Sequence, residues 1–403
     1  MLTMPKNMKE RYSPLYFLAS VGAGGLATTF FMYLLFWVPH PGRPVPVFED
    51  IMAHLASAST LAQAVTIFAM AAIAFFAFLN LRLLVWNLSE FAKFKKLDAF
   101  VNHQKTNAQT QVKAQALALA MSINVSFIVG LVFVPGLWGV VEYLFPVAIV
   151  AFLAVGVLAF RNLGQFLSRV LVEGGFDRAA NNSFAQLLPA FAFSMIGVGL
   201  AAPAAMSTIK ATAAVSLVAS TFFLVTSIIL MSIALVLGFA AMMKHGAAKE
   251  TSPTLLIVIP IVTVLGILVV RQDHGMHVFF ESHISNGDTL RFLTTLISIQ
   301  AVFALLGIMV LKAQKYWSHF ITGSDKSVGS YALVCPGVGF SVLFQFFINK
   351  GLVANGIVDK YSAIYWAFTA IAIASQMAMV WLLFKLNHKH FGAEARQAAV
   401  PAE

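Results

Sequence analysis

The stretch LVASTFFLVTSIILMSIALVLGF, residues 217–239, contains no charged side chain. A helix needs about 20 apolar residues to cross the hydrocarbon core of a bilayer. Strands of a membrane-spanning barrel are about ten residues long and alternate in polarity, and this stretch shows neither property. The segment therefore predicts a transmembrane α-helix.

The composition extends this prediction to the whole chain. Of 403 residues, 60% are hydrophobic and only 10% are charged, and the mean hydropathy is +0.84. A soluble core does not need so much apolar surface. We expect an all-α transmembrane domain over residues 13–386, between an N-terminal segment 1–12 and a C-terminal tail 387–403. Ten apolar segments are long enough to span: 13–38, 58–86, 114–134, 137–160, 185–206, 211–243, 253–270, 292–313, 328–349 and 361–386.

The distribution of Lys and Arg predicts the orientation. If the N-terminus is inside, only six of the 26 basic residues fall outside: Arg43, Lys210, Arg271, Arg291, Lys350 and Lys360. Cytoplasmic loops carry the excess of Lys and Arg. We therefore expect a multi-pass protein of the cell (inner) membrane with both termini in the cytoplasm. This topology accounts for the net charge of +10 without a nucleic-acid partner.

Few residues point to chemistry inside the membrane. The single Cys335 excludes a disulfide within the chain, and every His is assigned to a loop or terminus, so no haem is expected between spans. Glu142, near the outer end of the fourth span, is the one carboxylate inside a span. It is either an interfacial group reaching water or an ion contact. Without a nucleophile–base pair, we expect neither an enzyme nor a cofactor.

The stretch RQDHGMHVFFESH, residues 271–283, gathers His274, His277 and His283 with Asp273 and Glu281. The spacing matches no zinc motif. We expect an ordinary solvated outer loop, and a metal site in a folded-back loop is the alternative.

Small, polar and kinking residues concentrate in the odd-numbered spans. SVGAGGLA at 20–27 and SMIGVGLA at 194–201 form a faint repeat. Small residues allow close helix approach, and Pro frees carbonyls that can face a cavity. The alternative is that these residues only pack helices together. As lining candidates we take Ser20, Gly24, Ser126, Ser194, Gly197, Pro260, Thr263, Cys335, Pro336 and Gly337.

Four stretches resemble one known family: SPLYFLASVGAG (13–24), LPAFAFSMIGVGLA (188–201), SPTLLIVIPIVT (252–263) and SYALVCP (330–336). They are similar to the slow-anion-channel and tellurite-resistance/C4-dicarboxylate transporter family, over residues 13–386. The resemblance implies ten helices in five tandem hairpins, with the odd helices around a central pore, and assembly as a trimer. The resemblance implies that the partners of this chain are small anions and the lipid bilayer.

The ninth span departs from this family at the gate. The family places a pore-plugging Phe before a Pro, and here Cys335 stands at that position with Pro336 after it. A thiol cannot fill the space of a phenyl ring. Phe340 is therefore a candidate for a substitute constriction, with Phe17, Phe127 and Phe193 as further ones. Because Pro336 and two glycines weaken the helix, we expect a bent segment whose Cys335 faces water.

Together these features predict passive or weakly coupled transport of small anions through a pore. Backbone dipoles, hydroxyls and basic residues at the mouths would stabilise the anion, without a fixed cation inside. A proton-driven exporter of organic acids or metal oxyanions, such as tellurite or C4-dicarboxylates, is the closest alternative. A membrane enzyme or electron carrier and a non-transporting membrane subunit are the others.

Overall fold

A computed structural model describes residues 4–392, and within them ten helices are long and apolar enough to cross a membrane. The expected multi-pass, all-helical membrane architecture is thereby confirmed. The main helices of the spans are α1 (Phe17–Trp37), α3 (Thr60–Phe94), α5 (Ala114–Phe133), α6 (Leu137–Ser168), α7 (Leu188–Leu200), α9 (Lys210–His245), α10 (Val258–Phe280), α11 (Asn286–Ala313), α12 (Val334–Phe346) and α13 (Ala363–Phe391).

The odd and even spans differ in burial. In the most apolar stretch of each span, 50% to 94% of the residues of the odd spans are buried, against 22% to 39% in the even spans. The even helix α9 exposes Val218, Phe222 and Ile229, apolar side chains that suit contact with lipid. The odd spans therefore form the interior of the molecule.

Each odd span begins with a short 3₁₀ segment before its α-helix. These segments are Pro14–Tyr16, Asn107–Lys113, Phe184–Leu187, Lys249–Leu256 and Val328–Leu333. The first illustrates the cause, because Ser13 accepts a hydrogen bond from Leu15 N–H and Pro14 has no N–H to leave unpaired. The recurrence of this start shows that the odd spans share one local design.

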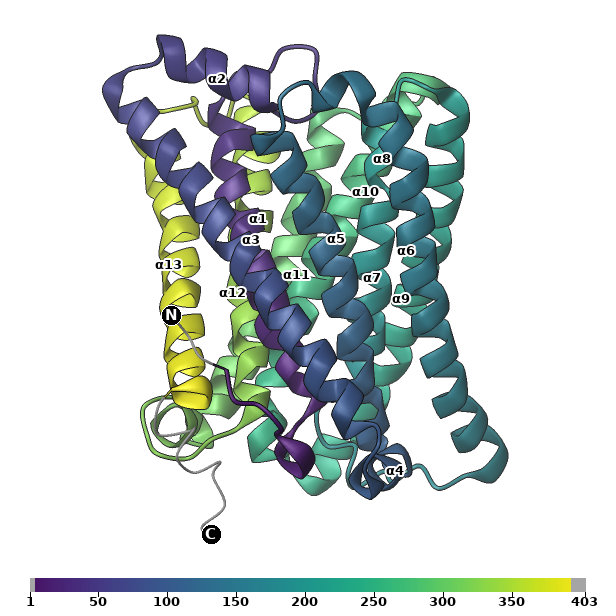
Figure 1. Cartoon of the computed structure of the whole chain (residues 1–403). Helices are drawn as coiled ribbons and strands as arrows, with labels where there is room; N and C mark the ends of the chain where they lie inside the picture. Colours follow the sequence, from purple (N-terminus) through teal and green to yellow (C-terminus); the bar gives the residue numbers. More distant parts are fainter. Residues whose placement is uncertain (1–3, 393–403) are drawn as a thin grey trace.

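The two ends of the helix bundle are distinct (Figure 1). The short helix α2 (Phe48–Ser57) lies across one end, here called the α2 end. The helix α1 begins and α13 ends at the opposite end, here called the terminal end. Residues 1–3 of the expected N-terminal segment and residues 393–403 of the expected tail lie outside the described residues. The last helix runs to Phe391, beyond the expected end of the apolar segment.

The main helices of the five odd spans are here called the inner helices. They contact one another in a closed ring, in the order α1, α5, α7, α10, α12 and back to α1. Glycine permits two of these close approaches. A Cβ added to Gly339 on α12 would lie 2.9 Å from Pro260 Cα on α10. A Cβ on Gly25 of α1 would lie 2.7 Å from a methyl carbon of Val338 on α12. Only hydrogen fits at these positions, so the glycines set the spacing of the ring.

Candidate functional site

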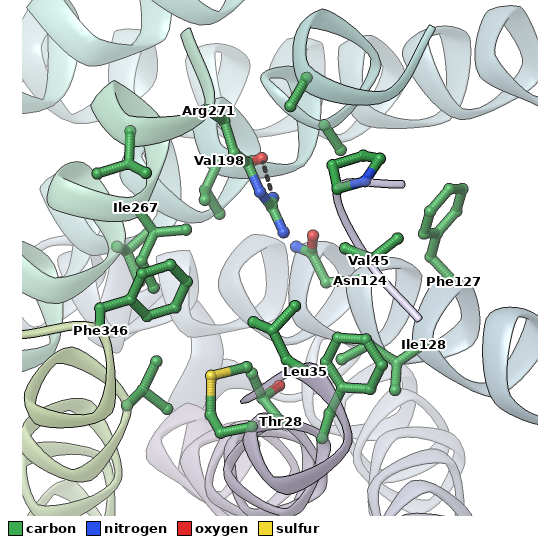
Figure 2. Close-up of a pocket in the computed structure, with 18 of the residues that line it drawn as sticks. Thr28, Leu35, Val45, Asn124, Phe127, Ile128, Val198, Ile267, Arg271 and Phe346 are labelled. Atoms are coloured by element: carbon green, nitrogen blue, oxygen red, sulfur yellow. Dashed lines mark hydrogen bonds between the residues drawn. The ribbon is translucent and has the colours of Figure 1, made fainter. Parts of the chain in front are cut away.

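A cavity of about 730 Å³ lies among the inner helices and reaches Phe145, Ala148 and Phe152 of the outer helix α6. All five inner helices line it, and so do residues of the segment 38–45 and of the segment 353–361, which lie near the α2 end. Such a volume falls in the range of pockets that hold small organic ligands. Figure 2 shows side chains converging on this space from several helices.

The cavity ends before it reaches the terminal end. Its deepest lining residues include Val21, Met121 and Cys335, near the starts of their helices. One helical turn further toward the terminal end, each inner span carries a side chain that is at most 2% exposed: Leu18, Leu117, Leu188, Ile257 and Tyr331. No residue of the five 3₁₀ starts lines the cavity, so the cavity ends in this buried layer, here called the floor, and its lining extends to the segments 38–45 and 353–361 near the α2 end.

The charges on the cavity wall are of one sign. Arg271, Lys350 and Lys360 line it, together with the titratable His40 and His274. No Asp or Glu is among the described residues that line it. Partial desolvation lowers the pKa of the Lys360 ammonium below its ordinary value. The wall therefore presents a positive electrostatic potential to whatever enters.

Arg271 is the cation that reaches into the cavity from the inner helices. Its Nη1 donates a hydrogen bond of 2.7 Å to the backbone carbonyl of Val198, near the end of α7. No ion pair formed by residues 4–392 includes Arg271. Figure 2 shows its guanidinium pointing toward the side chain of Asn124 on α5. A guanidinium has five N–H donors, so most of them are free to bind a ligand.

Three neutral polar side chains that the inner helices contribute to the wall are already engaged. Asn124 donates from Nδ2 to Ala120 O at 3.0 Å and to Met195 O at 3.4 Å. Thr28 donates to Gly24 O, and Thr263 donates to the carbonyls of Ile259 and Gly339. These hydroxyl protons stabilise the helices. Arg271 and His274 on α10 and Lys350 of the ninth span are the basic lining side chains of the inner spans, and their donors keep no acceptor, or only one, among residues 4–392.

Three of the residues predicted to line a conduit do line the cavity: Cys335, Pro260 and Thr263. Cys335 lies near the floor and is 5% exposed, so its thiol contacts the cavity with little surface. Phe127, named as a further constriction candidate, also lines the wall. The ninth span thus contributes to the cavity with the face that carries Cys335 and Gly339.

The other predicted lining residues lie at helix contacts, not on the cavity wall. Ser20 donates to Asn80 O on α3, and Asn80 Nδ2 donates to Ser20 O at 2.8 Å. The amide oxygen of Asn80 also accepts from Ser122 Oγ at 2.9 Å, so one buried Asn connects α1, α3 and α5. A Cβ on Gly24 would meet this same Asn80.

The remaining members of that set are placed similarly. Ser126 and Ser194 donate to carbonyls of their own helices, Ser122 O and Phe191 O. A Cβ on Gly197 would meet Leu268 and Phe223, and a Cβ on Gly337 would meet Met379 on α13. Pro336 is buried, and the Phe340 ring stacks on Phe344 at 5.1 Å. Helix packing accounts for these positions.

Glu142 has a structural set of partners. Its carboxylate accepts hydrogen bonds from Ser207 Oγ, from Thr208 Oγ1 and from the Thr208 backbone N–H. It holds the turn between the short helix α8 (Ala202–Met206) and α9. Glu142 does not line the cavity.

The structure corrects the expected solvated loop. Residues 271–280 continue α10, and the non-helical connection to α11 covers only residues 281–285. His274 lies on the cavity wall, whereas the rings of His277 and His283 lie 5.2 Å apart. His388 and His390 likewise belong to α13, so the assignment of every His to a loop or terminus is wrong. Within residues 4–392, no three His, Cys, Asp or Glu come together as metal ligands do.

Sequence reasoning also missed the cation of the site. Arg271 was assigned to an outer loop, and the cavity was expected to hold no fixed cation. The structure places Arg271 on α10 and on the cavity wall. A signal was available, because after Pro260 the apolar run 261–270 reaches Arg271 without a further Pro or a turn-forming cluster that would end the helix.

The fold and site thus define a multi-pass helical membrane protein with a one-sided, positively charged cavity. No family model, curated protein or solved structure matches this chain.

Proposed function

We propose that this protein transports small anions across a membrane, passively or with weak coupling, along a path that includes the cavity. The observation that carries the proposal is the positive charge of the cavity wall. Arg271, Lys350 and Lys360 line the cavity, and no Asp or Glu of the described residues lines it with them. A cation placed next to low-dielectric walls attracts anions and repels cations.

Arg271 provides this potential with a positive charge at a fixed place on the cavity wall. Holding an arginine within a membrane domain is costly unless it faces a partner or a water-filled space. Its one recorded hydrogen bond, to Val198 O, satisfies part of the guanidinium and leaves the remaining donors for an anion. Binding by Arg271, with Lys350 and Lys360 elsewhere on the wall and no closed cage of donors, suits a site that must also release its ligand.

The blind shape supports a transport cycle with a closed floor. In this proposal the buried layer at the level of Leu18, Leu117, Leu188 and Ile257 separates the cavity from the terminal end. We propose that this layer opens, or lets anions pass between its side chains, during transport. If both termini are cytoplasmic, as the basic residues predict, the cavity opens to the outside.

The finer architecture belongs to the same proposal. The closed ring of inner helices, the repeated 3₁₀ starts and the contacts of α1 with α3, α7 with α9 and α12 with α13 are those that five tandem hairpins around a central pore would make. They support the resemblance to the slow-anion-channel and tellurite-resistance/C4-dicarboxylate transporter family. Assembly as a trimer in the cell membrane follows from that resemblance.

Flux through proteoliposomes tests the proposal. Vesicles containing the protein should release chloride and nitrate faster than empty vesicles and should not release potassium. Arg271→Gln should lower anion flux about tenfold or more, because one charge-assisted hydrogen bond contributes about 1.5–3 kcal/mol. Arg291→Gln is the matched control, since Arg291 is exposed on α11 and does not line the cavity.

Two results would contradict the proposal. The first is the absence of anion flux across the panel with correctly folded protein. The second is an equal effect of Arg271→Gln and Arg291→Gln, which would mean that the cavity is not on the path.

A further inference from the structure

We infer that the cavity binds organic monoanions that combine one anionic head group with an apolar body about the size of one aromatic ring. This inference rests on the proposed anion function and specifies the substrate class of the same site. It is drawn from the donors that the wall leaves free and from the chemistry of the surface around them.

The head group is defined by Arg271. The guanidinium keeps several N–H donors without a partner among residues 4–392, and its planar fork fits the oxygens of a carboxylate or a sulfonate. The labelled neighbours of Arg271 in Figure 2, Val198 and Ile267, are uncharged, and the cations Lys350 and Lys360 come from other segments of the wall. A second anionic group close to the first would be buried without a partner.

The engaged hydroxyls leave a small bare anion only weakly bound, which permits its passage but not its tight binding. The protons of Thr28 and Thr263 are donated to backbone carbonyls, and both amide protons that Asn124 could offer have carbonyl acceptors in their reach. An inorganic anion that lost its water here would regain hydrogen bonds from Arg271 and few other groups. Its desolvation would be poorly compensated.

An apolar body compensates for that loss. Figure 2 shows Leu35, Ile128 and Phe346 around the space that the guanidinium faces, with Phe127 further along the wall. The cavity of about 730 Å³ has room for an aromatic ring beside these side chains. Burying such a ring removes apolar surface from water both on the ligand and on the wall.

A pair of sulfonates with the same head group isolates the two contributions. Sulfonates stay ionised at neutral pH, so they do not cross the bilayer as neutral acids. Binding of benzenesulfonate and of methanesulfonate is measured by calorimetry on the protein in lipid nanodiscs, and nitrate flux is measured in parallel. We expect benzenesulfonate to bind at least tenfold more tightly than methanesulfonate and to inhibit nitrate flux from the α2 end.

Two variants assign the contributions to residues. Arg271→Gln should abolish binding of benzenesulfonate, whereas the control Arg291→Gln should retain it. Leu35→Gln should weaken benzenesulfonate binding several-fold and leave methanesulfonate binding unchanged, because only the apolar contact is altered. If Leu35→Gln loses the preference for benzenesulfonate over methanesulfonate but still binds both through Arg271, the apolar contact with the ring is demonstrated.

The outcomes separate this inference from the proposed function. Nitrate flux that depends on Arg271, with equal or no binding of the two sulfonates, would overturn the inference and leave anion transport standing. Absence of all anion flux would remove the proposed function and the inference with it. Benzenesulfonate binding that survives Arg271→Gln would place the ligand elsewhere and would also overturn the inference.

Discussion

Gly339→Ala tests whether the contact between α10 and α12 is as close as the structure shows. The added Cβ would lie 2.9 Å from Pro260 Cα and 3.0 Å from Thr263 Oγ1. Carbon atoms in contact prefer about 3.5–4.0 Å, so the two helices must separate by roughly half an ångström or more. Because Pro260 Cα is a backbone atom, a side-chain rotation cannot relieve the clash.

The expected cost follows from two effects. Overpacking of a well-packed contact typically costs about 1–3 kcal/mol. Separation also stretches the hydrogen bond of 2.9 Å from Thr263 Oγ1 to Gly339 O, and a hydrogen bond between membrane helices contributes about 0.6 kcal/mol on average. We expect Gly339→Ala to lower the free energy of unfolding by about 2–3 kcal/mol.

The assay is unfolding in mixed micelles by titration with a denaturing detergent, followed by tryptophan fluorescence. Gly164→Ala is the matched control, because Gly164 lies within α6 and no atom approaches its hypothetical Cβ within 4 Å. Relief from the helix cost of glycine should stabilise that variant by about 0.5–1 kcal/mol. If Gly339→Ala were as stable as Gly164→Ala, the close approach of α10 and α12 would be refuted.

Four further predictions concern the site and the topology. A small cationic thiol reagent should modify Cys335 slowly, since it is 5% exposed, and should then reduce anion flux; Cys335→Ala should be insensitive, and a fast reaction without loss of flux would contradict its place near the floor. Burial lowers the pKa of Lys360, so its charge is present below that pKa and is lost above it, and anion flux should fall at alkaline pH earlier than in Lys360→Arg. Glu142→Gln should retain flux when the proton gradient is collapsed, whereas loss of flux would favour a proton-driven exporter. Reporter fusions at residue 280 and at the C-terminus should give opposite signals, and equal signals would contradict the ten-span topology.

Hydropathy located the ten spans because lipid contact demands apolar side chains over a fixed length. It misplaced several helix ends, because helices continue into polar sequence past the apolar runs. The helix α3 runs to Phe94, beyond the predicted residue 86, and α10 runs to Phe280, beyond residue 270. Hydropathy measures burial in lipid and does not measure where backbone hydrogen bonding stops.

The site was less accessible to sequence reasoning. In the sequence, Ser20 and Thr263 are both small polar residues of inner spans. In the structure, Ser20 forms hydrogen bonds with Asn80 on α3, whereas Thr263 lies on the cavity wall. The difference is a rotation about the helix axis, which one sequence does not reveal. Arg271 was hidden for another reason, since the polar residues that follow it resemble a loop.

In the proposed transport cycle, the closed floor would also concentrate the electric field. Water that enters the cavity carries the potential of one compartment down to the level of Val21, and about seven residues of helix separate that level from Pro14, where the first span begins. At 1.5 Å per residue this distance is about 10 Å, a third of the roughly 30 Å hydrocarbon core. Under that proposal the membrane potential would fall across this thin layer, and a charge crossing it would experience about 2.3 kcal/mol per 100 mV within a few side-chain widths.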